Sequence, residues 1–198
     1  MKIQELDLKG LQIVTHDVFP DERGSFEELY NEEKFREMGI HTLFVQDSLP
    51  RSRKGVIRGL HFQWDKPLTK LMEVISGRLL AVAVDIRVDS PTLGQHVAIT
   101  LGDDKAESLF IPFGFATGIC ALSDDLIFTY KYSATWNSKG ESNIVWNDPT
   151  LKIDWGIKDP IVSPRDRTAQ TFDAWIKTPE SKLFTMEASE RFGAGMGK

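Results

Sequence analysis

The 198-residue sequence contains one cysteine, Cys120, and therefore cannot form an internal disulfide. Nothing in its cysteine content indicates an oxidising compartment. Cys120 lies in the apolar run 115–122, where a buried and unreactive thiol is expected. No apolar stretch approaches the ~20 residues that a membrane-spanning helix requires, and the first residues lack the basic start and apolar core of a secretory signal. These absences predict a soluble, cytoplasmic protein.

Positive charge is not in excess. The chain has 24 lysines and arginines against 29 aspartates and glutamates, which gives a net charge of −5. General affinity for nucleic acid or for an anionic membrane requires clustered positive charge, so neither is expected as a partner. The net charge still permits a local basic pocket for one small anionic ligand.

The histidines lack the spacing of a common metal site. Metal sites built on β-strands often use a His-x-His pair with a carboxylate and a further histidine. The four histidines here are His16, His41, His61 and His96, and no two of them are two residues apart. The sequence therefore predicts no metal site, with His16, His41 and His96 in surface or structural roles.

Short apolar runs separated by turn residues extend from residue 42 to about residue 145. The strands that they predict cover residues 42–46, 71–75, 79–86, 96–101, 108–112, 118–122 and 126–132. Strands of this length and spacing are typical of a sandwich or barrel rather than of alternating α/β units. We therefore expect an all-β jelly roll or a related barrel, with a few short peripheral helices.

Helix signals are few. Asn31 is placed to cap a short helix over residues 32–38, which Gly39 would end. A second helix is predicted near residues 172–176, and the Gly-rich end, 192–198, is expected to fray. We expect a jelly-roll domain over residues 1–170, with residues 171–198 as a C-terminal extension of the same domain.

The segment 54–63 has the highest density of functional groups. On a regular strand Gly59 and His61 would share one face, and Arg58 would point to the other unless a bulge at Gly59 turned it. Lys70 begins the next predicted strand. The pattern alone gives a histidine near one arginine and one lysine, which suits a structural histidine as well as a catalytic one.

Three other segments are ambiguous when each is taken by itself. Residues 21–28 predict a turn followed by a strand with solvated charges. Residues 163–167 form a charged loop, and Tyr130 with Lys131 lies on a predicted strand. Charged segments of this kind are common on protein surfaces, and a tyrosine on a strand most often packs in the core or on the surface.

Taken together and in order, these segments resemble the dTDP-4-dehydrorhamnose 3,5-epimerase family. The resemblance covers roughly residues 5 to 170. The matching segments are residues 21–28, 44–47, 55–63, 70–71, 84–92, 111–116, 130–131, 141, 146–149, 163 and 166. One such motif would carry little weight, but an ordered series is far more specific.

The resemblance implies a cupin-like jelly roll (a double-stranded β-helix) that forms a homodimer without a metal or organic cofactor. It also implies a nucleotide-diphosphate 4-keto-6-deoxy sugar as the substrate. It implies that His61 is the general base, Asp166 its carboxylate partner and Tyr130 the general acid. The positions that it implies as substrate contacts are Arg23, Glu28, Gln46, Arg58, Lys70, Thr117, Glu141 and Arg165.

These residue types suit the implied chemistry. A ketone at C4 acidifies the hydrogens on C3 and C5, because the resulting carbanion is delocalised onto O4 as an enolate. Histidine is a suitable base near neutral pH, and a carboxylate such as Asp166 can fix its tautomer. Lys70, with Arg58, can stabilise the charge on O4. Inversion then requires a proton from the opposite ring face, for which Tyr130 is a neutral donor.

Three residues depart from the family pattern. Thr117 stands where the family usually has a histidine, Arg165 where a lysine is common, and Trp136 where a tyrosine is often found. Our first hypothesis is epimerisation at both C3 and C5 on the route to L-rhamnose. The Thr117 change leaves open a C3-only or C5-only epimerase on a variant nucleotide sugar. A 4-keto to 3-keto isomerase and a sugar-binding jelly roll without turnover are further alternatives.

Overall fold

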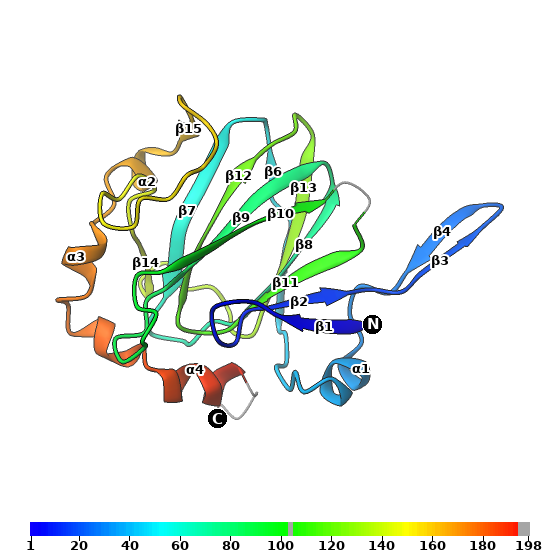
Figure 1. The fold of residues 1–198 in the computed structure, drawn as a ribbon, viewed down its shortest axis with the longest axis horizontal. Coiled ribbons are helices and arrows are strands. Elements are labelled where there is room, and N and C mark those ends of the chain that lie inside the picture. The colour runs from blue at the N-terminus through cyan, green and yellow to red at the C-terminus, as the bar shows by residue number, and fades with distance from the viewer. Residues whose placement is uncertain (103–104, 194–198) are drawn as a thin grey trace.

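Two β-sheets face each other in the computed structural model, which describes residues 1–102 and 105–193 (Figure 1). The seven-stranded sheet has the order β1-β2-β11-β8-β13-β5, with β6 also paired to β13. The six-stranded sheet has the order β10-β9-β12-β7-β14, with β15 also paired to β7. Every ladder within these two sheets is antiparallel except the one between β15 and β7. The predicted all-β jelly roll with short peripheral helices is confirmed.

The strands of the seven-stranded sheet are β1 (Lys2–Glu5), β2 (Gln12–Thr15), β5 (Gln46–Ser48), β6 (Arg51–Ser52), β8 (Lys70–Ser76), β11 (Glu107–Ile111) and β13 (Leu126–Tyr132). Those of the six-stranded sheet are β7 (Val56–Gln63), β9 (Arg78–Asp85), β10 (His96–Gly102), β12 (Phe115–Ala121), β14 (Glu141–Asn143) and β15 (Ile161–Val162).

Six of the seven predicted strands are confirmed with small shifts at their ends, and the strand predicted over residues 42–46 is wrong. The corresponding strand, β5, begins at Gln46. Leu43 and Val45 are exposed, although the β-branched side chain of Val45 favours strands. The backbone N–H of Val45 already donates to the carbonyl of Tyr132, but the regular ladder with β13 starts only at the next residue. Residues 42–45 instead belong to the connection between a short helix over residues 32–37 and β5, and this tertiary arrangement outweighs the strand propensity of the segment.

The main core fills the space between the two sheets. Leu79, Ala81 and Ala83 of β9 point into it and pack with Met72 and Phe128 of the other sheet. The alternate residues of β9, such as Val82 and Val84, belong to a second apolar cluster on the outer face of the six-stranded sheet. Both faces of β9 are therefore buried, which explains why its sequence is almost continuously apolar.

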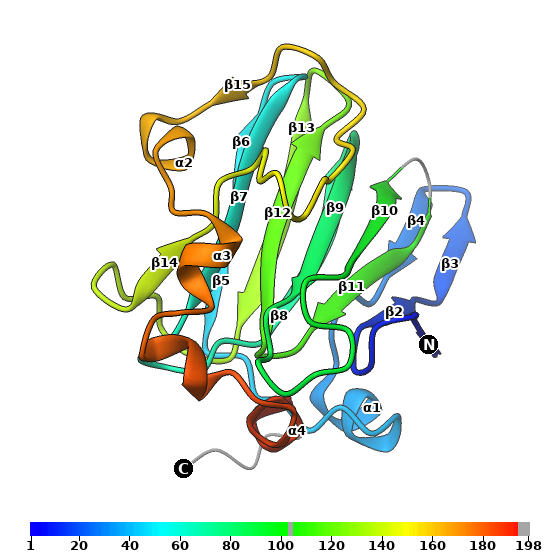
Figure 2. The same cartoon turned by 60° about the vertical axis from the view of Figure 1, so that its left-hand side comes forward.

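The C-terminal region supplies the outer cover of the six-stranded sheet (Figure 2). It contains α3 (Phe172–Trp175), the 3₁₀ helix η1 (Glu180–Leu183) and α4 (Met186–Gly193). The rings of Phe62 and Trp175 lie 4.5 Å apart, and those of Phe113 and Phe184 lie 4.4 Å apart. The helix predicted near 172–176 is confirmed. Of the end expected to fray, residues 192–193 are helical and 194–198 lie outside the described residues.

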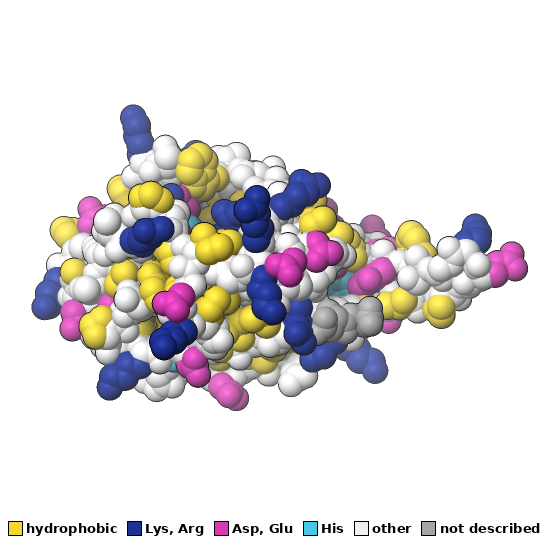
Figure 3. All heavy atoms as spheres, turned by 90° about the horizontal axis from the view of Figure 1, so that it is seen from above, with side chains coloured by type: hydrophobic (Ala, Val, Ile, Leu, Met, Phe, Trp, Pro, Cys, Tyr) yellow, Lys and Arg dark blue, Asp and Glu magenta, His cyan; other side chains and the backbone are white. Residues whose placement is uncertain are grey.

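A hairpin of β3 (Val18–Asp21) and β4 (Gly24–Glu27) projects from the body of the molecule (Figures 1 and 3). Phe19 and Phe26 pack against each other on it and are 56% and 67% exposed. The hairpin is followed by α1 (Glu32–Glu37), which Asn31 caps as predicted. None of the helices in the described part of the chain has the length and apolar character needed to cross a bilayer.

The turn after β9 is held by a buried ion pair. Asp85 accepts hydrogen bonds from Nε and a terminal nitrogen of Arg87 at 2.8 and 2.7 Å, and from the hydroxyls of Ser90 and Thr92 at 2.6 Å each. The Arg87 guanidinium also lies 4.4 Å from the centre of the Phe115 ring. The sequence segment 84–92 therefore has a structural role at this turn.

Candidate active site

A bulge in β7 determines which of its side chains reach the cavity. In the ladder with β12, Thr117 pairs with His61 and Ile119 pairs with Arg58, so β7 contains one extra residue in this interval. Gly59 adopts φ +132°, and a Cβ there would lie 2.5 Å from the Cα of Gly118. Only glycine fits this close approach without strain. The bulge anticipated at Gly59 is present, and Arg58 and His61 line the same cavity.

His61 is hydrogen-bonded to a buried carboxylate. Its Nε2 lies 2.7 Å from Oδ1 of Asp166, and the two side chains are 27% and 4% exposed. No group in the described part of the chain hydrogen-bonds to the other ring nitrogen, Nδ1. With Nε2–H donated to the carboxylate, Nδ1 carries the lone pair that a general base requires.

A short helix, α2 (Pro164–Arg167), presents Asp166 to β7. Ser163 caps it by accepting a hydrogen bond from the backbone N–H of Asp166 at 3.1 Å, and a proline follows at the first helical position. The Asp166 carboxylate also accepts from the Gly59 N–H and from the Asn143 amide, both at 3.3 Å. Burial raises the pKa of Asp166, but these bonds and the nearby His61 outweigh it, and its pKa falls below the usual value.

Lys70 places a buried amine beside this pair. It begins β8, and its Nζ donates to the backbone carbonyl of His61 at 3.1 Å. Burial, partly opposed by the Glu141 carboxylate, lowers the pKa of Lys70 to about 8. The amine is therefore still mostly protonated at neutral pH and can stabilise a negative charge in the cavity.

Tyr130 reaches the cavity from the opposite sheet. It lies on β13, whereas His61 lies on β7 of the six-stranded sheet. Its ring stacks on Tyr132 at 5.5 Å, and Lys70 Nζ lies 5.9 Å from its centre. Burial and the neighbouring Tyr132 raise the pKa of Tyr130, while Arg58 acts in the other direction. Its phenol is consequently protonated at neutral pH and can act as a proton donor.

These side chains surround a cavity of about 180 Å³. It brings together six predicted site residues, which are Arg58, His61, Lys70, Thr117, Tyr130 and Glu141. Asp166 joins them through its bond to His61. The Thr117 side chain is buried, and its hydroxyl has no hydrogen-bond partner among the described residues.

Two predicted substrate contacts lie beside this set rather than in it. Arg165 forms an ion pair with Glu141 at 2.6 Å. Gln46 accepts a hydrogen bond from the backbone N–H of Trp136, a residue that does line the cavity. Both positions are connected to the cavity through one neighbour.

Arg23 and Glu28 are not brought to this cavity within the chain. Arg23 lies on the projecting hairpin and pairs with Asp21, its neighbour in the turn. Glu28, directly after the hairpin, pairs with Lys34 at 2.6 Å. The side-chain hydrogen bonds and ion pairs of both residues go to Asp21, Asn31 and Lys34, which do not line the His61 cavity.

Sequence reasoning missed Tyr132 and Asn143. Tyr132 lies two residues after Tyr130, so the period of a strand could have placed both rings on one face. Asn143 pairs with His61 across β14 and β7, and its amide donates to Asp166. No signal in the sequence gives that register.

Neither the lining nor its hydrogen-bond partners suggest a metal centre in this cavity. Among the described residues, the His, Cys, Asp and Glu side chains close enough to share an ion are His16, Glu27 and Glu73, which lie outside it. His16 proves to be buried. The arrangement around His61 instead provides a base with its carboxylate, a cation and a neutral acid, which suffices for proton transfer next to a carbonyl.

Comparison with known proteins identifies the family of the chain. The model of the dTDP-4-dehydrorhamnose 3,5-epimerase family matches residues 5–174. The dTDP-4-dehydrorhamnose 3,5-epimerase of Methanothermobacter thermautotrophicus is 44% identical over 163 residues, which are 81% of this chain and 88% of that protein.

Solved structures give the same result over nearly the whole chain. An rmlC epimerase of Mycobacterium tuberculosis superposes with a TM-score of 0.91 at 34% identity, and 100% of each chain is covered. The RmlC dTDP-6-deoxy-D-glucose-3,5-epimerase of Legionella pneumophila, solved with dTDP-4-keto-L-rhamnose, has a TM-score of 0.86 at 36% identity. That match covers 93% of this chain and 97% of the other. The chain thus belongs to the dTDP-4-dehydrorhamnose 3,5-epimerase family of isomerases.

Proposed function

We propose that the protein inverts C3 and C5 of dTDP-4-keto-6-deoxyglucose on the route to L-rhamnose. The observation that carries this proposal is the hydrogen bond between His61 Nε2 and Asp166, in a cavity also lined by Lys70 and Tyr130. The family membership and the related structure that holds dTDP-4-keto-L-rhamnose support the choice of substrate.

In the proposed reaction, His61 Nδ1 removes a proton from the carbon next to the C4 ketone. The electrons of the C–H bond form a C=C bond, and the carbonyl electrons move onto O4 as an enolate. The Lys70 ammonium stabilises this oxygen, and Asp166 stabilises the imidazolium. Tyr130 then gives its proton to the opposite face of the carbon, and the carbonyl re-forms. The origin of His61 and Tyr130 on facing sheets supports this assignment of base and acid.

Charged groups near the cavity suit a nucleotide diphosphate. We assign contacts with the substrate to Arg58, Thr117 and Glu141 in the lining, and to Gln46 and Arg165 beside it. Arginine binds phosphate oxygens through two nitrogens at once, which favours Arg58 and Arg165 for the anionic part.

For Arg23 and Glu28 we propose that a second copy of the chain completes each site. The hairpin that carries Arg23 projects from the body and exposes Phe19 and Phe26, as an arm that packs on another subunit would do. A homodimer in which each hairpin reaches the partner's cavity would give both residues access to substrate.

Mixing two inactive variants tests this arrangement. Arg23→Ala and His61→Ala chains, unfolded together and refolded, should regain activity, because a mixed dimer contains one site with both residues intact. Mixtures that stay inactive although light scattering detects dimers would reject the shared site.

The epimerase activity itself is tested by NMR with dTDP-4-keto-6-deoxyglucose in deuterated water. We expect deuterium to enter both C3 and C5, and His61→Ala to abolish the exchange while circular dichroism reports a folded protein. His96→Ala, at a histidine outside the cavity, is the matched control. No exchange at either carbon with the wild-type enzyme would refute the proposal.

Thr117 favours a second candidate, an epimerase that inverts one carbon only. Its hydroxyl has no hydrogen-bond partner among the described residues and faces the cavity where the family usually has a histidine. Exchange confined to C3 or to C5 in the same NMR experiment would support this candidate.

A further inference from the structure

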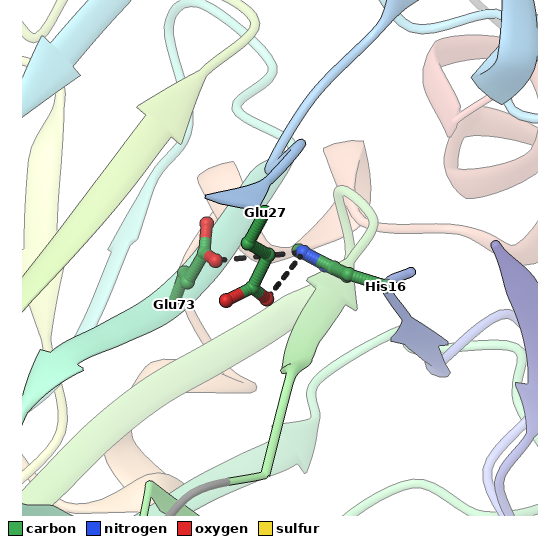
Figure 4. A group of neighbouring side chains, drawn as sticks. All are labelled: His16, Glu27 and Glu73. Carbon is green, nitrogen blue, oxygen red and sulfur yellow. Dashed lines mark ion pairs between the residues drawn. The ribbon is translucent and has the colours of Figure 1, made fainter. Parts of the chain in front are cut away.

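Three ionisable side chains meet outside the His61 cavity, at the base of the projecting hairpin (Figure 4). His16 follows β2, Glu27 ends β4, and Glu73 lies within β8. His16 Nδ1 lies 3.3 Å from Oε1 of Glu27 and 3.6 Å from Oε1 of Glu73. The function proposed above uses none of these three residues.

The His16 ring nitrogens have unequal surroundings. Nε2 lies 2.9 Å from the Ser108 hydroxyl, whereas Nδ1 has no hydrogen-bond partner among the described residues although the ring is fully buried. Buried polar atoms are nearly always paired, so an orphaned nitrogen aimed at two carboxylates calls for an explanation.

The three groups face one another around the unpartnered nitrogen. In the tautomer that donates Nε2–H to Ser108, Nδ1 carries a lone pair and cannot donate to either carboxylate. A cation between them would accept that lone pair and pair with both carboxylates.

We propose that His16 Nδ1, Glu27 and Glu73 bind one divalent transition-metal cation of the Zn²⁺ type. Zn²⁺ binds histidine nitrogen and carboxylate oxygen at about 2.0–2.2 Å in a tetrahedron, which separates neighbouring ligand atoms by roughly 3.4 Å. The two distances from Nδ1 match this value, and all three ligand atoms lie within 4.8 Å of one another. Two carboxylates also balance the charge of the ion.

The surroundings suit such a site. The Ser108 bond to Nε2 holds the imidazole in the orientation that a ligand needs, which is the usual outer contact of a metal-bound histidine. Glu27 also lines a hollow of about 650 Å³ beside β8. The hollow makes one of the three proposed ligands accessible from solvent.

An ion at this place would fasten the hairpin to the body. His16 precedes β3 and Glu27 ends β4, so the two ends of the hairpin would be tied to Glu73 of the seven-stranded sheet. Since a cation that binds only the folded arrangement adds its binding free energy to stability, the protein should unfold at a higher temperature when Zn²⁺ is present.

The test uses the full chain, stripped with a chelator and dialysed at pH 8 against micromolar Zn²⁺. We expect elemental analysis to find one Zn²⁺ per chain, and Glu27→Gln and Glu73→Gln to lose it. Glu22→Gln, at the tip of the same hairpin, is the matched control. Glu27 is partly exposed, so its variant is expected to fold even if substitution of His16 disturbs the core.

Thermal unfolding provides a second measurement. Zn²⁺ should raise the melting temperature of the wild type and of Glu22→Gln, and leave that of Glu27→Gln unchanged. Wild-type protein that holds no Zn²⁺ under these conditions, or variants that hold as much as the wild type, would overturn the proposal. Both measurements are independent of epimerase activity.

Discussion

Asp166 and His61 are 105 residues apart in the sequence, and the carboxylate oxygen of the first lies 2.7 Å from Nε2 of the second. This contact identifies Nδ1 as the ring nitrogen available for proton transfer. The hydrogen bond between the two residues also depends on two local features of the backbone. These are the bulge at Gly59 in β7 and the serine-capped helix α2.

Asp166→Asn should lower kcat by roughly 10²–10⁴-fold without unfolding the protein, because an amide neither stabilises the imidazolium nor fixes the correct tautomer. Steady-state kinetics with circular dichroism checks this expectation, and Asp173→Asn, at an exposed site, serves as the control. A kcat within a few-fold of the wild type would remove Asp166 from the mechanism.

Tyr130→Phe should separate proton removal from inversion. The variant retains His61 and Lys70, so deuterium should still exchange into the substrate, while formation of the inverted sugar should fall by roughly 10²-fold or more. NMR follows both quantities in one sample. Inversion at the rate of the Tyr30→Phe control would show that another group supplies the proton.

Lys70→Met should stabilise the fold while reducing activity. Burial lowers the folded-state pKa of Lys70 to about 8 from 10.5, so carrying the charge costs up to about 3 kcal/mol. The folded protein loses this proton before the unfolded chain does, and wild-type stability therefore rises with pH between these values. The difference in unfolding free energy between Lys70→Met and the wild type should be largest below pH 8 and should shrink towards pH 10.5.

Denaturant unfolding at several pH values measures this difference. Lys139→Met, at an exposed lysine, provides the control and should show no such dependence. A Lys70→Met protein that is less stable than the wild type at pH 7 would contradict the expectation.

Asp85→Asn should destabilise the protein by about 3–5 kcal/mol at pH 7, because it leaves the buried Arg87 without its counter-charge. Burial acts to raise the pKa of Asp85, but its hydrogen bonds with Arg87, Ser90 and Thr92 bring it below the usual value. The carboxylate therefore stabilises the fold above the unfolded-state pKa of about 4. This contribution is lost as the pH falls through the lower folded-state pKa.

Unfolding experiments at pH 7 and at progressively lower pH check both parts of that prediction. The exposed Asp7→Asn variant is the control. Equal stability of Asp85→Asn and wild type at pH 7 would mean that the ion pair makes no net contribution.

The strands with clear apolar runs, such as β9 and β13, were predictable because their burial follows directly from the sequence. Residues 42–46 were not, since Val45 favours a strand but lies exposed in a connection together with Leu43. Whether residues 42–46 form a strand depends on how far their pairing with β13 extends. The side chains of Leu43 and Val45 do not encode the extent of that pairing.

The local sequence pattern predicted some residues of the candidate site, but not the contacts between segments that are distant in the sequence. The pattern of β7 and the start of β8 gave a histidine near an arginine and a lysine, and it gave Gly59 as the place for a bulge. The carboxylate partner of His61 came only from the family resemblance, because the contact joins segments far apart in the sequence. Asn143 was missed for a similar reason, since its contact depends on the register between β14 and β7.

The bulge in β7 has a consequence for protein engineering. Arg58 and His61 are an odd number of residues apart and still line one cavity, because the extra residue at Gly59 reverses the alternation of the strand. If this pair were grafted onto a regular strand with the same spacing, one side chain would enter the new cavity and the other would point away from it. A working graft must therefore transfer the bulge as well, or respace the two residues by an even number.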